Sequence, residues 1–598
     1  MTGAILNQAV GATQFINTMK IKVLTGREAN SWVQDKTNQA NWQGLYAACP
    51  WGTVCQSAEF VLTWYDAYQS QWTPVIVLGT RADGDLAGLL TLAVSDSTGE
   101  LVAAGAYQAE YQTWLAELRD GDSFIVSALD ELGRHFPKAH LRFLFVPPAT
   151  PLAWATTDSV WQGRCEIRHL PRALMAVGDG SACRESLRKK SNRSRLNRME
   201  RIGTVRFERI TNPNEIAAIF DEVMLYSDFR LGATHGVEPL RDPLKKQFYV
   251  AMMREPRLLH ATVLRVGDKI AAAHVGLYNK DQVLLGILAH SPFFAKHSPG
   301  KLHVLLLCTE LAQEGITTFD LTPGGEYKDR FATHYDDTYI LTVFFNRTQH
   351  VRHKLNRKLA AGAKLVLSAG KVTPAQARAA AAQLQHKWAH LKVASLPPKL
   401  FNIASASLWG TREMRVYTYD VETARQLAVP QLMHRDHLPD LLAYQPAEAW
   451  QPRFSPFLQH ALERLESGMH VYTHVVAGRL VHYGWLIERQ RRSYISEVGH
   501  EIYLPPDSAV LTDYYTHPAA RGQGLYRQSL KQMLHDAALI PGTKHIFIAV
   551  LANNRPSRHV IEKVGFTYQF SLFTKKVGGR ARRWDNAPTE FTHPVEQL

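Results

Sequence analysis

The sequence predicts an α/β protein with mixed sheets of the α+β kind, arranged as several cores along the chain. One order of elements occurs twice: a β-hairpin, a strand, a glycine turn, a helix and a further strand, near 258–321 and near 471–551. The continuous apolar run His545–Leu551 is typical of a strand that is buried on both faces. A length of 598 residues is enough for about four domains.

The N-terminal part alternates between short strands and helices from Met19 onwards. Phe60, Trp64 and Ala67 recur at helical spacing, and Asp83-Gly84 is a hairpin turn between two apolar runs. Strands are predicted at 20–24, 74–78, 86–93 and 140–146, and helices at 57–67 and 123–134.

The middle and C-terminal parts carry the repeated order of elements. The middle part begins with a basic segment, 184–201, that is predicted as one helix ending before Gly203. Strands are predicted at 205–210, 258–266, 270–278, 282–289, 317–321, 471–476, 480–487, 509–515 and 545–551. Helices are predicted at 213–226, 298–315 and 458–465, after the glycine turn near 524, and before Gly565.

Composition limits the possible function classes. No apolar run approaches the roughly 20 residues that span a membrane, and the first residues lack the basic start and apolar core of a signal peptide. The five cysteines are odd in number and scattered without metal spacing, which favours a reducing cytoplasm. No histidine pair is expected to bind a metal, so no metal is predicted.

The net charge of 68 − 54 = +14 raises the question of nucleic acid. Eight of the Lys and Arg residues fall within 184–201, against Glu185 and Glu200. Because no aromatic residues are interleaved with them, we expect a solvated helix or one that faces phosphorylated ligands, and nucleic acid is not the expected partner.

The most informative stretch is 516–527, where a strand turns through Gly522 and Gly524 into a helix. Backbone N–H groups at such a turn are unpaired and point outward at the positive end of the helix, which suits a pyrophosphate. The alternative is a strand–turn–helix connection without a ligand.

Three motifs in this region resemble the GNAT family of acetyl-coenzyme A-dependent N-acetyltransferases. Arg521-x-x-Gly524 is similar to the pyrophosphate loop of the family, and Asn554-x-x-Ser557 with Glu562-Lys563-x-Gly565-Phe566 is similar to its later helix and strand. The resemblance implies acetyl-CoA as co-substrate, bound by loop, strand-end and later-helix residues. These residues are Thr516, Arg521, Gly522, Gln523, Gly524, Leu525, Asn554 and Ser557.

Two positions depart from the family pattern. Tyr526 stands where the loop usually has a small residue, and Ile561 stands where many members have the tyrosine that protonates the leaving thiolate. The predicted catalytic residues are therefore Asp513 or Glu497 as the base, with Tyr515 as a catalytic candidate; Tyr514 and Tyr526 are further replacements for the acid. Surface carboxylates and aromatic packing are the alternative roles for these side chains.

The middle region resembles the CelD/BcsL group, which is similar to FemAB-like tandem acyltransferases and is associated with exopolysaccharide biosynthesis. The resemblance rests on Ser298-Pro299-Gly300-Lys301-Leu302, on the segment from Asp320 to Lys328, and more weakly on Cys55-Gln56-Ser57-x-x-Phe60. Tyr327 and Lys328 are predicted to contact substrate or phosphate, because they follow a strand end. Ser298, Gly300 and Lys301 are candidates for a phosphate-bearing donor at a helix N-terminus; an exposed lysine in a plain turn is the alternative.

These observations predict six parts along the chain. They are a disordered leader (1–18), a degenerate first half (19–170), a CelD/BcsL-like core (180–360), a helical connector (361–411), a C-terminal GNAT domain (412–585) and a disordered tail (586–598).

Three functional hypotheses follow from this organisation. The leading one is a cytoplasmic acyltransferase that moves an acetyl group from acetyl-CoA to a primary amine, with an amino-sugar of polysaccharide assembly as acceptor. The alternatives are Fem-like aminoacyl transfer from tRNA, and a core that has lost catalysis and serves as a binding scaffold.

Overall fold

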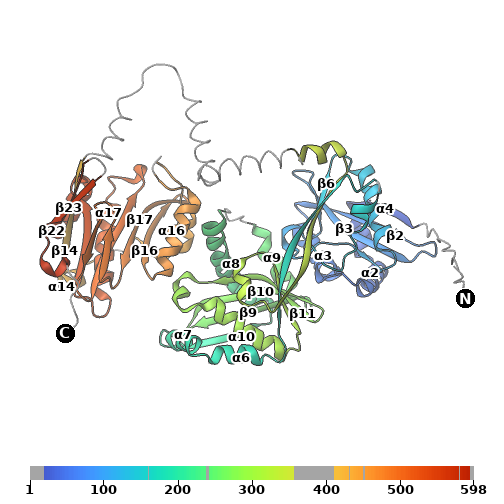
Figure 1. Cartoon of the computed structure of the whole chain (residues 1–598), viewed down its shortest axis with the longest axis horizontal. Coiled ribbons are helices and arrows are strands. Elements are labelled where there is room, and N and C mark those ends of the chain that lie inside the picture. The colour runs from blue at the N-terminus through green and yellow to red at the C-terminus, as the bar shows by residue number, and fades with distance from the viewer. Residues whose placement is uncertain are drawn as a thin grey trace, which may run out of the picture. The chain divides into compact units, whose positions relative to one another are not determined.

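The computed structural model describes residues 19–158, 160–236, 242–353, 355, 410–429, 431–448, 451–577 and 580–592. The predicted leader and nearly all of the predicted connector lie outside the described residues. The chain divides into two compact units, one carrying the N-terminal and middle sheets and the other the C-terminal sheet, and each unit is described by itself. Figure 1 labels their elements.

The N-terminal sheet is antiparallel, in the order β1-β2-β3-β4 with β5 beside β3. Its strands are β1 (Lys20–Thr25), β2 (Trp72–Thr80), β3 (Leu86–Ser95), β4 (Leu101–Ala103) and β5 (Leu115–Ala116). Its helices are α1 (Arg27–Gln34), α2 (Lys36–Ala48), α3 (Ala58–Tyr68) and α4 (Gly121–His135), with short turns η1 (Val54–Gln56) and η2 (Ala106–Gln108). The ring of Phe124 on α4 lies directly on the cross-strand pair Gly79 and Gly88, where an added Cβ would come within 2.7 Å and 2.2 Å of it. These two glycines therefore permit α4 to pack close to the sheet.

The middle sheet has eight strands in the order β6-β13-β7-β12-β11-β10-β9-β8. The strands are β6 (His140–Val146), β7 (Cys165–Ala176), β8 (Val205–Ile210), β9 (Leu259–Val266), β10 (Lys269–Asn279), β11 (Gln282–His290), β12 (Thr318–Pro323) and β13 (His334–Phe344). The helices of this part of the chain are α5 (Trp154–Thr157), α6 (Ser181–Arg188), α7 (Lys190–Glu200), α8 (Pro213–His235), α9 (Pro243–Met252) and α10 (Pro299–Gln313), with turns η3 (Pro292–His297) and η4 (Glu326–Arg330). The strand predicted at 140–146 pairs with β13, so it belongs to this sheet and not to the N-terminal one.

The single basic helix predicted for 184–201 is wrong. Two helices, α6 and α7, meet at Lys189, whose ψ of 137° is extended and ends the first helix. The Asn192 side chain donates a hydrogen bond to the Ser186 carbonyl at 2.7 Å, and this bond satisfies an end carbonyl that a continuous helix would have paired internally.

The C-terminal sheet has the order β15-β16-β17-β20-β21-β14-β22-β23, and β18 and β19 form a separate hairpin. The strands are β14 (Gly410–Tyr419), β15 (His434–Arg435), β16 (His470–Val476), β17 (Arg479–Ile487), β18 (Arg492–Ile495), β19 (His500–Tyr503), β20 (Ser508–Thr516), β21 (His545–Leu551), β22 (Thr567–Val577) and β23 (Arg580–Asp585). The helices are α14 (Val421–Arg425), α15 (Leu438–Leu442), α16 (Phe454–Glu466), α17 (Leu525–Leu539), α18 (Arg555–Val564) and α19 (Thr589–Thr592), with the turn η5 (Pro518–Ala520).

Alternating side chains of this sheet enter two apolar clusters. On β21, Ile546 and Ile548 pack with α17, whereas Phe547 packs with the β18–β19 hairpin and Phe591 of α19. Phe591 is 5% exposed, so the predicted disorder of the tail is wrong for the turn that carries this side chain.

The two large sheets share one local topology, and this confirms the predicted fold class. In each sheet a hairpin is followed by a strand, a helix and a second strand that pairs in parallel with the strand before the helix. In the middle sheet these are the hairpin β9–β10, then β11, α10 and β12; in the C-terminal sheet they are the hairpin β16–β17, then β20, α17 and β21. The strand before the helix also contains a residue with positive φ in both cases, Gly286 in β11 (51°) and Asp513 in β20 (49°). The conformation of Asp513 is therefore part of a local irregularity that both cores have, and the pairing of β20 with β17 shifts register there.

A half-buried charge cluster connects β16 with the residues that follow β15 and β17. His470 lies 2.6 Å from a carboxylate oxygen of Asp436 and 2.9 Å from one of Glu488. Burial disfavours the charged ring, but the hydrogen bonds to these two carboxylates outweigh burial and raise the pKa of His470 to about 9.

We expect the C-terminal sheet to lose stability as the pH rises from about 6.5 to about 9. A histidine whose pKa is higher in the folded state than in the unfolded state stabilises the folded state. This stabilisation, here about 3 kcal/mol, is complete when the pH is below the unfolded-state pKa and is lost as the pH rises past the folded-state pKa. Hydrogen exchange of β16 and β17 amides, measured between pH 6 and 9.5 and corrected for intrinsic exchange, reports the change. His470→Gln should flatten this dependence; an equal pH dependence in the variant would contradict the assignment.

Candidate active sites

The glycine turn of the C-terminal core has the geometry of an anion site. Gly522 and Gly524 have φ of 80° and 79°, and an added Cβ at either position would meet no atom within 4 Å. Gly524 precedes α17 without any side-chain cap. Among the described residues we find no partner for the N–H groups of Gly522, Gln523 and Gly524. The turn therefore presents free donors and open space at a helix N-terminus.

The side chains of the loop make contacts within the protein. Arg521 donates from Nε to the Thr516 carbonyl at 3.1 Å and forms an ion pair with Glu448 at 2.8 Å. Its charge is thus partly balanced before any ligand binds. Gln523 donates to the Ala519 carbonyl at 3.3 Å, and Leu525 is buried in the core below α17.

Tyr526 reaches the residues predicted to line the cofactor arm. Its hydroxyl lies 3.0 Å from the Ser557 hydroxyl on α18, while Asn554 caps that helix by accepting from the Ser557 N–H at 3.3 Å. Burial raises the pKa of Tyr526 to about 12, so the side chain keeps its proton at neutral pH. Ile561, on the same helix, is fully buried in the core.

A buried polar atom without a partner lies on β17, where His482 pairs with Thr516 at the end of β20. The Thr516 hydroxyl and His482 Nδ1 are hydrogen-bonded at 2.9 Å, and burial lowers the pKa of His482 to about 3, so this ring is neutral. No partner for its Nε2 occurs within the described part of the chain. An orphaned polar atom at this position is consistent with a binding site for a polar ligand group.

Two of the three predicted catalytic residues, Asp513 and Tyr515, lie near Tyr483, whereas Glu497 lies in another part of the core. Asp513 is engaged in an ion pair with Arg464 of α16. Glu497 lies in the turn of the β18–β19 hairpin. Its neighbour Val498 belongs to the apolar cluster of Phe547, on the face of the C-terminal sheet opposite to α17. Tyr515 is 6% exposed and packs against Tyr483 with ring centroids 5.6 Å apart; burial raises its pKa.

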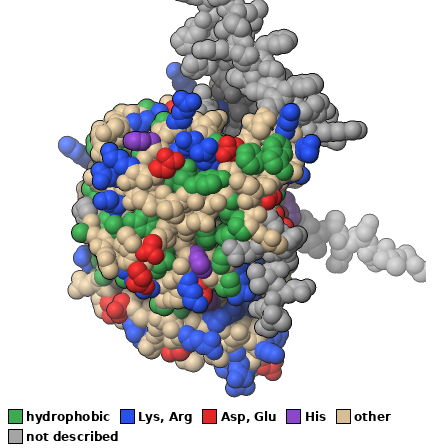
Figure 2. Space-filling view, turned by 90° about the vertical axis from the view of Figure 1, so that its left-hand side faces the viewer, with side chains coloured by type: hydrophobic (Ala, Val, Ile, Leu, Met, Phe, Trp, Pro, Cys, Tyr) green, Lys and Arg blue, Asp and Glu red, His purple; other side chains and the backbone are tan. Residues whose placement is uncertain are grey.

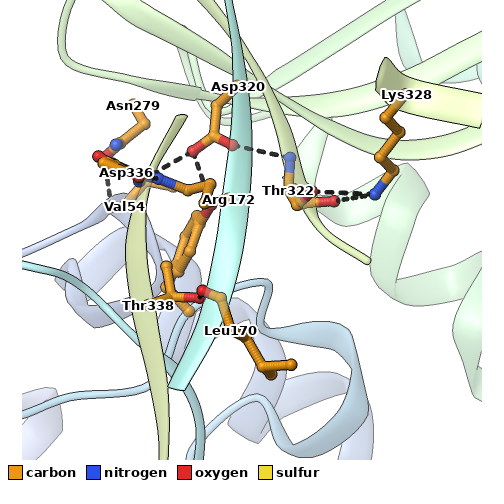
Figure 3. Close-up of polar contacts among 10 residues, drawn as sticks. Val54, Leu170, Arg172, Asn279, Asp320, Thr322, Lys328, Asp336 and Thr338 are labelled. Atoms are coloured by element: carbon orange, nitrogen blue, oxygen red, sulfur yellow. Dashed lines mark hydrogen bonds and ion pairs between the residues drawn. The ribbon is translucent and has the colours of Figure 1, made fainter. Parts of the chain in front are cut away.

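In the middle core, a buried polar network surrounds the carboxyl end of β12. Asp320 is fully buried and accepts hydrogen bonds from the Tyr111 hydroxyl at 2.7 Å and from Arg172 at 3.1 Å. The other side of the Arg172 guanidinium binds Asp336, with its Nε 2.7 Å from one carboxylate oxygen. Burial opposes the charge on Arg172, yet Asp336 and Asp320 outweigh it and raise its pKa. Figure 3 shows Asp320 between Arg172 and the Thr322 amide.

Lys328 holds the loop that follows β12. Its Nζ donates to the carbonyl and hydroxyl of Thr322 at 3.1 Å and 3.0 Å and lies 3.4 Å from the Pro323 carbonyl (Figure 3). Thr322 has φ of 59°, a strained conformation for a β-branched residue, and Lys328 and Asp320 both stabilise it. Lys328, only 7% exposed, therefore supports the loop through its ammonium donors and is not placed for the direct substrate contact predicted from sequence, whereas Tyr327 is 44% exposed and accessible.

Glu110, a residue of the N-terminal half that carries no sequence motif, lies close enough to Lys328 and Tyr327 for its charge to act on both. Burial raises the pKa of its carboxyl group to about 7, against the opposing charge of Lys328. Burial lowers the pKa of Lys328 to about 8, and the negative charge of Glu110 opposes this shift. The same charge helps burial to raise the pKa values of Tyr327 and Tyr249. No hydrogen bond to the Glu110 carboxylate occurs among the residues described. A carboxylate with a pKa near neutral pH, close to Lys328 and without a hydrogen bond of its own within the described part of the chain, is a candidate base.

A possible metal site lies elsewhere in the C-terminal core. His434 and His437 contact opposite oxygens of Asp440 at 2.9 Å and 2.7 Å, and the Thr473 hydroxyl orients the same carboxylate at 2.6 Å. The ligand atoms of these two histidines and the aspartate lie within 4.8 Å of one another. The prediction that no histidine pair binds a metal stays a prediction, although two histidines and one carboxylate are the donor set of a known type of metal site.

The surface and the helices add two observations. On the face drawn in Figure 2, Lys and Arg side chains lie among acidic and uncharged ones over much of the surface. Within the described ranges, no helix combines the length and the apolar character that crossing a membrane requires.

Comparison with known proteins identifies two domains. Residues 186–333 and residues 431–567 each match an acetyltransferase (GNAT) domain family. No curated protein matches the chain.

Solved structures that resemble the chain include FemX (9% identity, 52% of this chain and 96% of that chain covered, TM-score 0.37). L-PGS from Bacillus licheniformis shows 13% identity, with coverage of 50% and 95% and a TM-score of 0.32. A conserved protein of unknown function from Bacteroides thetaiotaomicron shows 12% identity, with coverage of 51% and 97% and a TM-score of 0.34.

Proposed function

Because the chain contains two GNAT acetyltransferase domains, we propose that it is an acyltransferase that moves an acetyl group from acetyl-CoA to a primary amine. The observation that carries the proposal is the pair of domain matches, each of which covers a strand, a turn, a helix and a parallel strand. When bound, acetyl-CoA supplies the acyl group as a thioester: a C–S bond breaks, a C–N bond forms, the amine loses a proton and the thiolate gains one.

In the middle core, Glu110 is the base that we propose for the amine proton. Its carboxyl group titrates near pH 7, so a large fraction is ionised at neutral pH and can accept a proton. Lys328 and Asp320 position the loop at Thr322 beside it. Tyr327, the accessible side chain of the loop, is the substrate contact.

In the C-terminal core, the loop from Arg521 to Leu525 would hold the pyrophosphate of acetyl-CoA. Unpaired N–H groups, open space at both glycines and the orphaned Nε2 of His482 are consistent with this ligand. Of the three tyrosines considered from sequence, Tyr526 is the proposed proton donor, because its protonated hydroxyl contacts Ser557. Asp513 remains the proposed base of this core, and it must separate from Arg464 to act.

The acceptor that we propose is an amino-sugar of polysaccharide assembly, on the strength of the CelD/BcsL resemblance of the middle region. A panel of amino-sugars and simple amines, assayed for release of CoA thiol, tests this class. Turnover of no amine in the panel would contradict the proposed function.

We expect Gly524→Glu to weaken acetyl-CoA binding at the C-terminal core at least tenfold. The new carboxylate would stand at the helix N-terminus, where it would occupy the free N–H groups and repel a pyrophosphate. Isothermal titration of the intact chain with acetyl-CoA measures the change.

Gly468→Glu is the matched control for this substitution. Gly468 has φ of 89° and equally open surroundings beyond α16, so its replacement carries the same backbone strain and charge. If wild-type protein gives no saturable heat, or if both variants lose affinity equally, the loop does not hold acetyl-CoA.

A further inference from the structure

The end of α6 and one face of α7 line a hollow, open to solvent, that neither proposed active site uses. It has a volume of about 490 Å³ and is lined by residues from the end of α6 and along α7. These residues are Arg188, Lys190, Arg193, Ser194, Asn197, Arg198 and Arg201. Five of the seven are cationic, and none is acidic.

The lining residues of α7 form one face of that helix. Their spacing follows i, i+3, i+4, i+7 and i+8, which places them side by side along the axis. All seven lining side chains are exposed. The arrangement includes like-charged pairs three residues apart, Lys190 with Arg193 and Arg198 with Arg201, each of which costs an isolated helix a few tenths of a kcal/mol.

The cations are also free of acidic partners. Among the described residues, none of the five forms an ion pair, although the nearby Arg184 pairs with Asp179 at 3.8 Å. Guanidinium groups offer planar pairs of donors that match phosphate oxygens, and five of these cations together require a ligand with several negative charges.

The hollow is separate from the site around Glu110. β12 runs from Thr318, which pairs with Ala176, to Pro323, which pairs with Arg172. Helix α6 begins shortly after Ala176, whereas Lys328 follows Pro323, so the two features are joined to opposite ends of a strand that spans about 17 Å. Figure 1 shows α6 and α7 near the lower edge of this unit.

We propose that this hollow binds a compact oligophosphate group, such as the one that a nucleoside diphosphate or triphosphate carries. Its volume lies in the range of small-ligand sites, and no aromatic side chain lines it to stack the bases of a single-stranded nucleic acid. Unpaired cations line the hollow on one helix face, so a short polyanion in it can contact neighbouring cations such as Lys190 with Arg193.

Titration calorimetry of the intact chain with inorganic tripolyphosphate at low salt tests the proposal. We expect saturable binding that Arg193→Glu combined with Arg198→Glu weakens at least tenfold. Lys22→Glu combined with Lys138→Glu is the control, because it changes the net charge equally at exposed positions of the N-terminal half. If the first variant does not fold, as judged by thermal unfolding, Arg193→Gln with Arg198→Gln replaces it.

Three outcomes would overturn the proposal: no saturable binding by the unaltered chain, equal loss in the control variant, or much tighter binding of tRNA that is lost with the same two arginines. The last result would assign the hollow to nucleic acid. Competition between ADP and tripolyphosphate would support a shared phosphate site. The glycine turn at Gly522 and Gly524 is also a candidate phosphate site, so the hollow is assigned only by the loss of binding that the Arg193 and Arg198 substitutions cause; Gly524→Glu, which leaves the hollow intact, tests the acyl-transfer site separately.

Discussion

Glu110→Gln should lower the turnover of the middle core by about 10²–10⁴, the range that a positioned general base contributes. The substitution keeps the size of the side chain and removes its ability to accept a proton. Because the pKa of the Glu110 carboxyl group is about 7, the wild-type rate should rise as the pH passes through 7, and the variant should lose this rise. Release of CoA thiol between pH 5.5 and 9, with the best amine of the panel, measures both effects.

The measurement needs a background in which the other core is silent. Comparing chains with and without Glu110→Gln, both carrying Gly524→Glu and assayed at acetyl-CoA concentrations too low for the weakened C-terminal core, assigns the difference in turnover to the middle core. Glu100→Gln, at an exposed position of the same half, controls for the loss of a carboxylate. A variant that retains turnover within a few-fold, or that retains the pH profile, would remove Glu110 as the base.

The sequence predicts the repeated core well, because that core depends on local signals. Apolar runs, hairpin turns and helix-starting glycines are encoded within short windows, and the predicted strand at 545–551 agrees with β21. The long strands β7 and β13 were not predicted. β7 contains Pro171 and several charged residues, and its pairing with β13 connects segments that lie far apart in the chain.

The site residues differ in the same way: some are predictable from neighbouring residues, and others depend on contacts between distant parts of the chain. The glycine turn was predicted from its own residues, and the structure places Gly522 and Gly524 in the left-handed region. Glu110 carries no motif, and its shifted pKa depends on burial and on Lys328, which the fold brings near it. The place of Lys328 after a strand predicts a substrate or phosphate contact, whereas in the fold its ammonium group is bound to Thr322.

Arg172→Met should destabilise the N-terminal and middle unit by about 3–5 kcal/mol, the usual cost of removing one partner from a buried ion pair. The substitution leaves Asp320 fully buried without its cation, and the remaining Tyr111 and Thr322 donors are neutral. Methionine preserves much of the apolar volume of the arginine stem, so the loss reports chiefly on charge. Hydrogen exchange of peptides that cover β7 and β12 measures the free energy of opening.

A second substitution separates the ion pair from the packing around it. Asp320→Asn combined with Arg172→Met removes both charges, so the double variant should be more stable than the sum of the two single losses predicts, by up to about 3 kcal/mol. Arg168→Met, at an exposed position of the same strand, should change stability by less than about 0.5 kcal/mol. If the two single losses simply added, Arg172 and Asp320 would act independently. Arg172 would then not support the Thr322 loop through Asp320, whose Oδ1 accepts from the Thr322 amide at 2.8 Å.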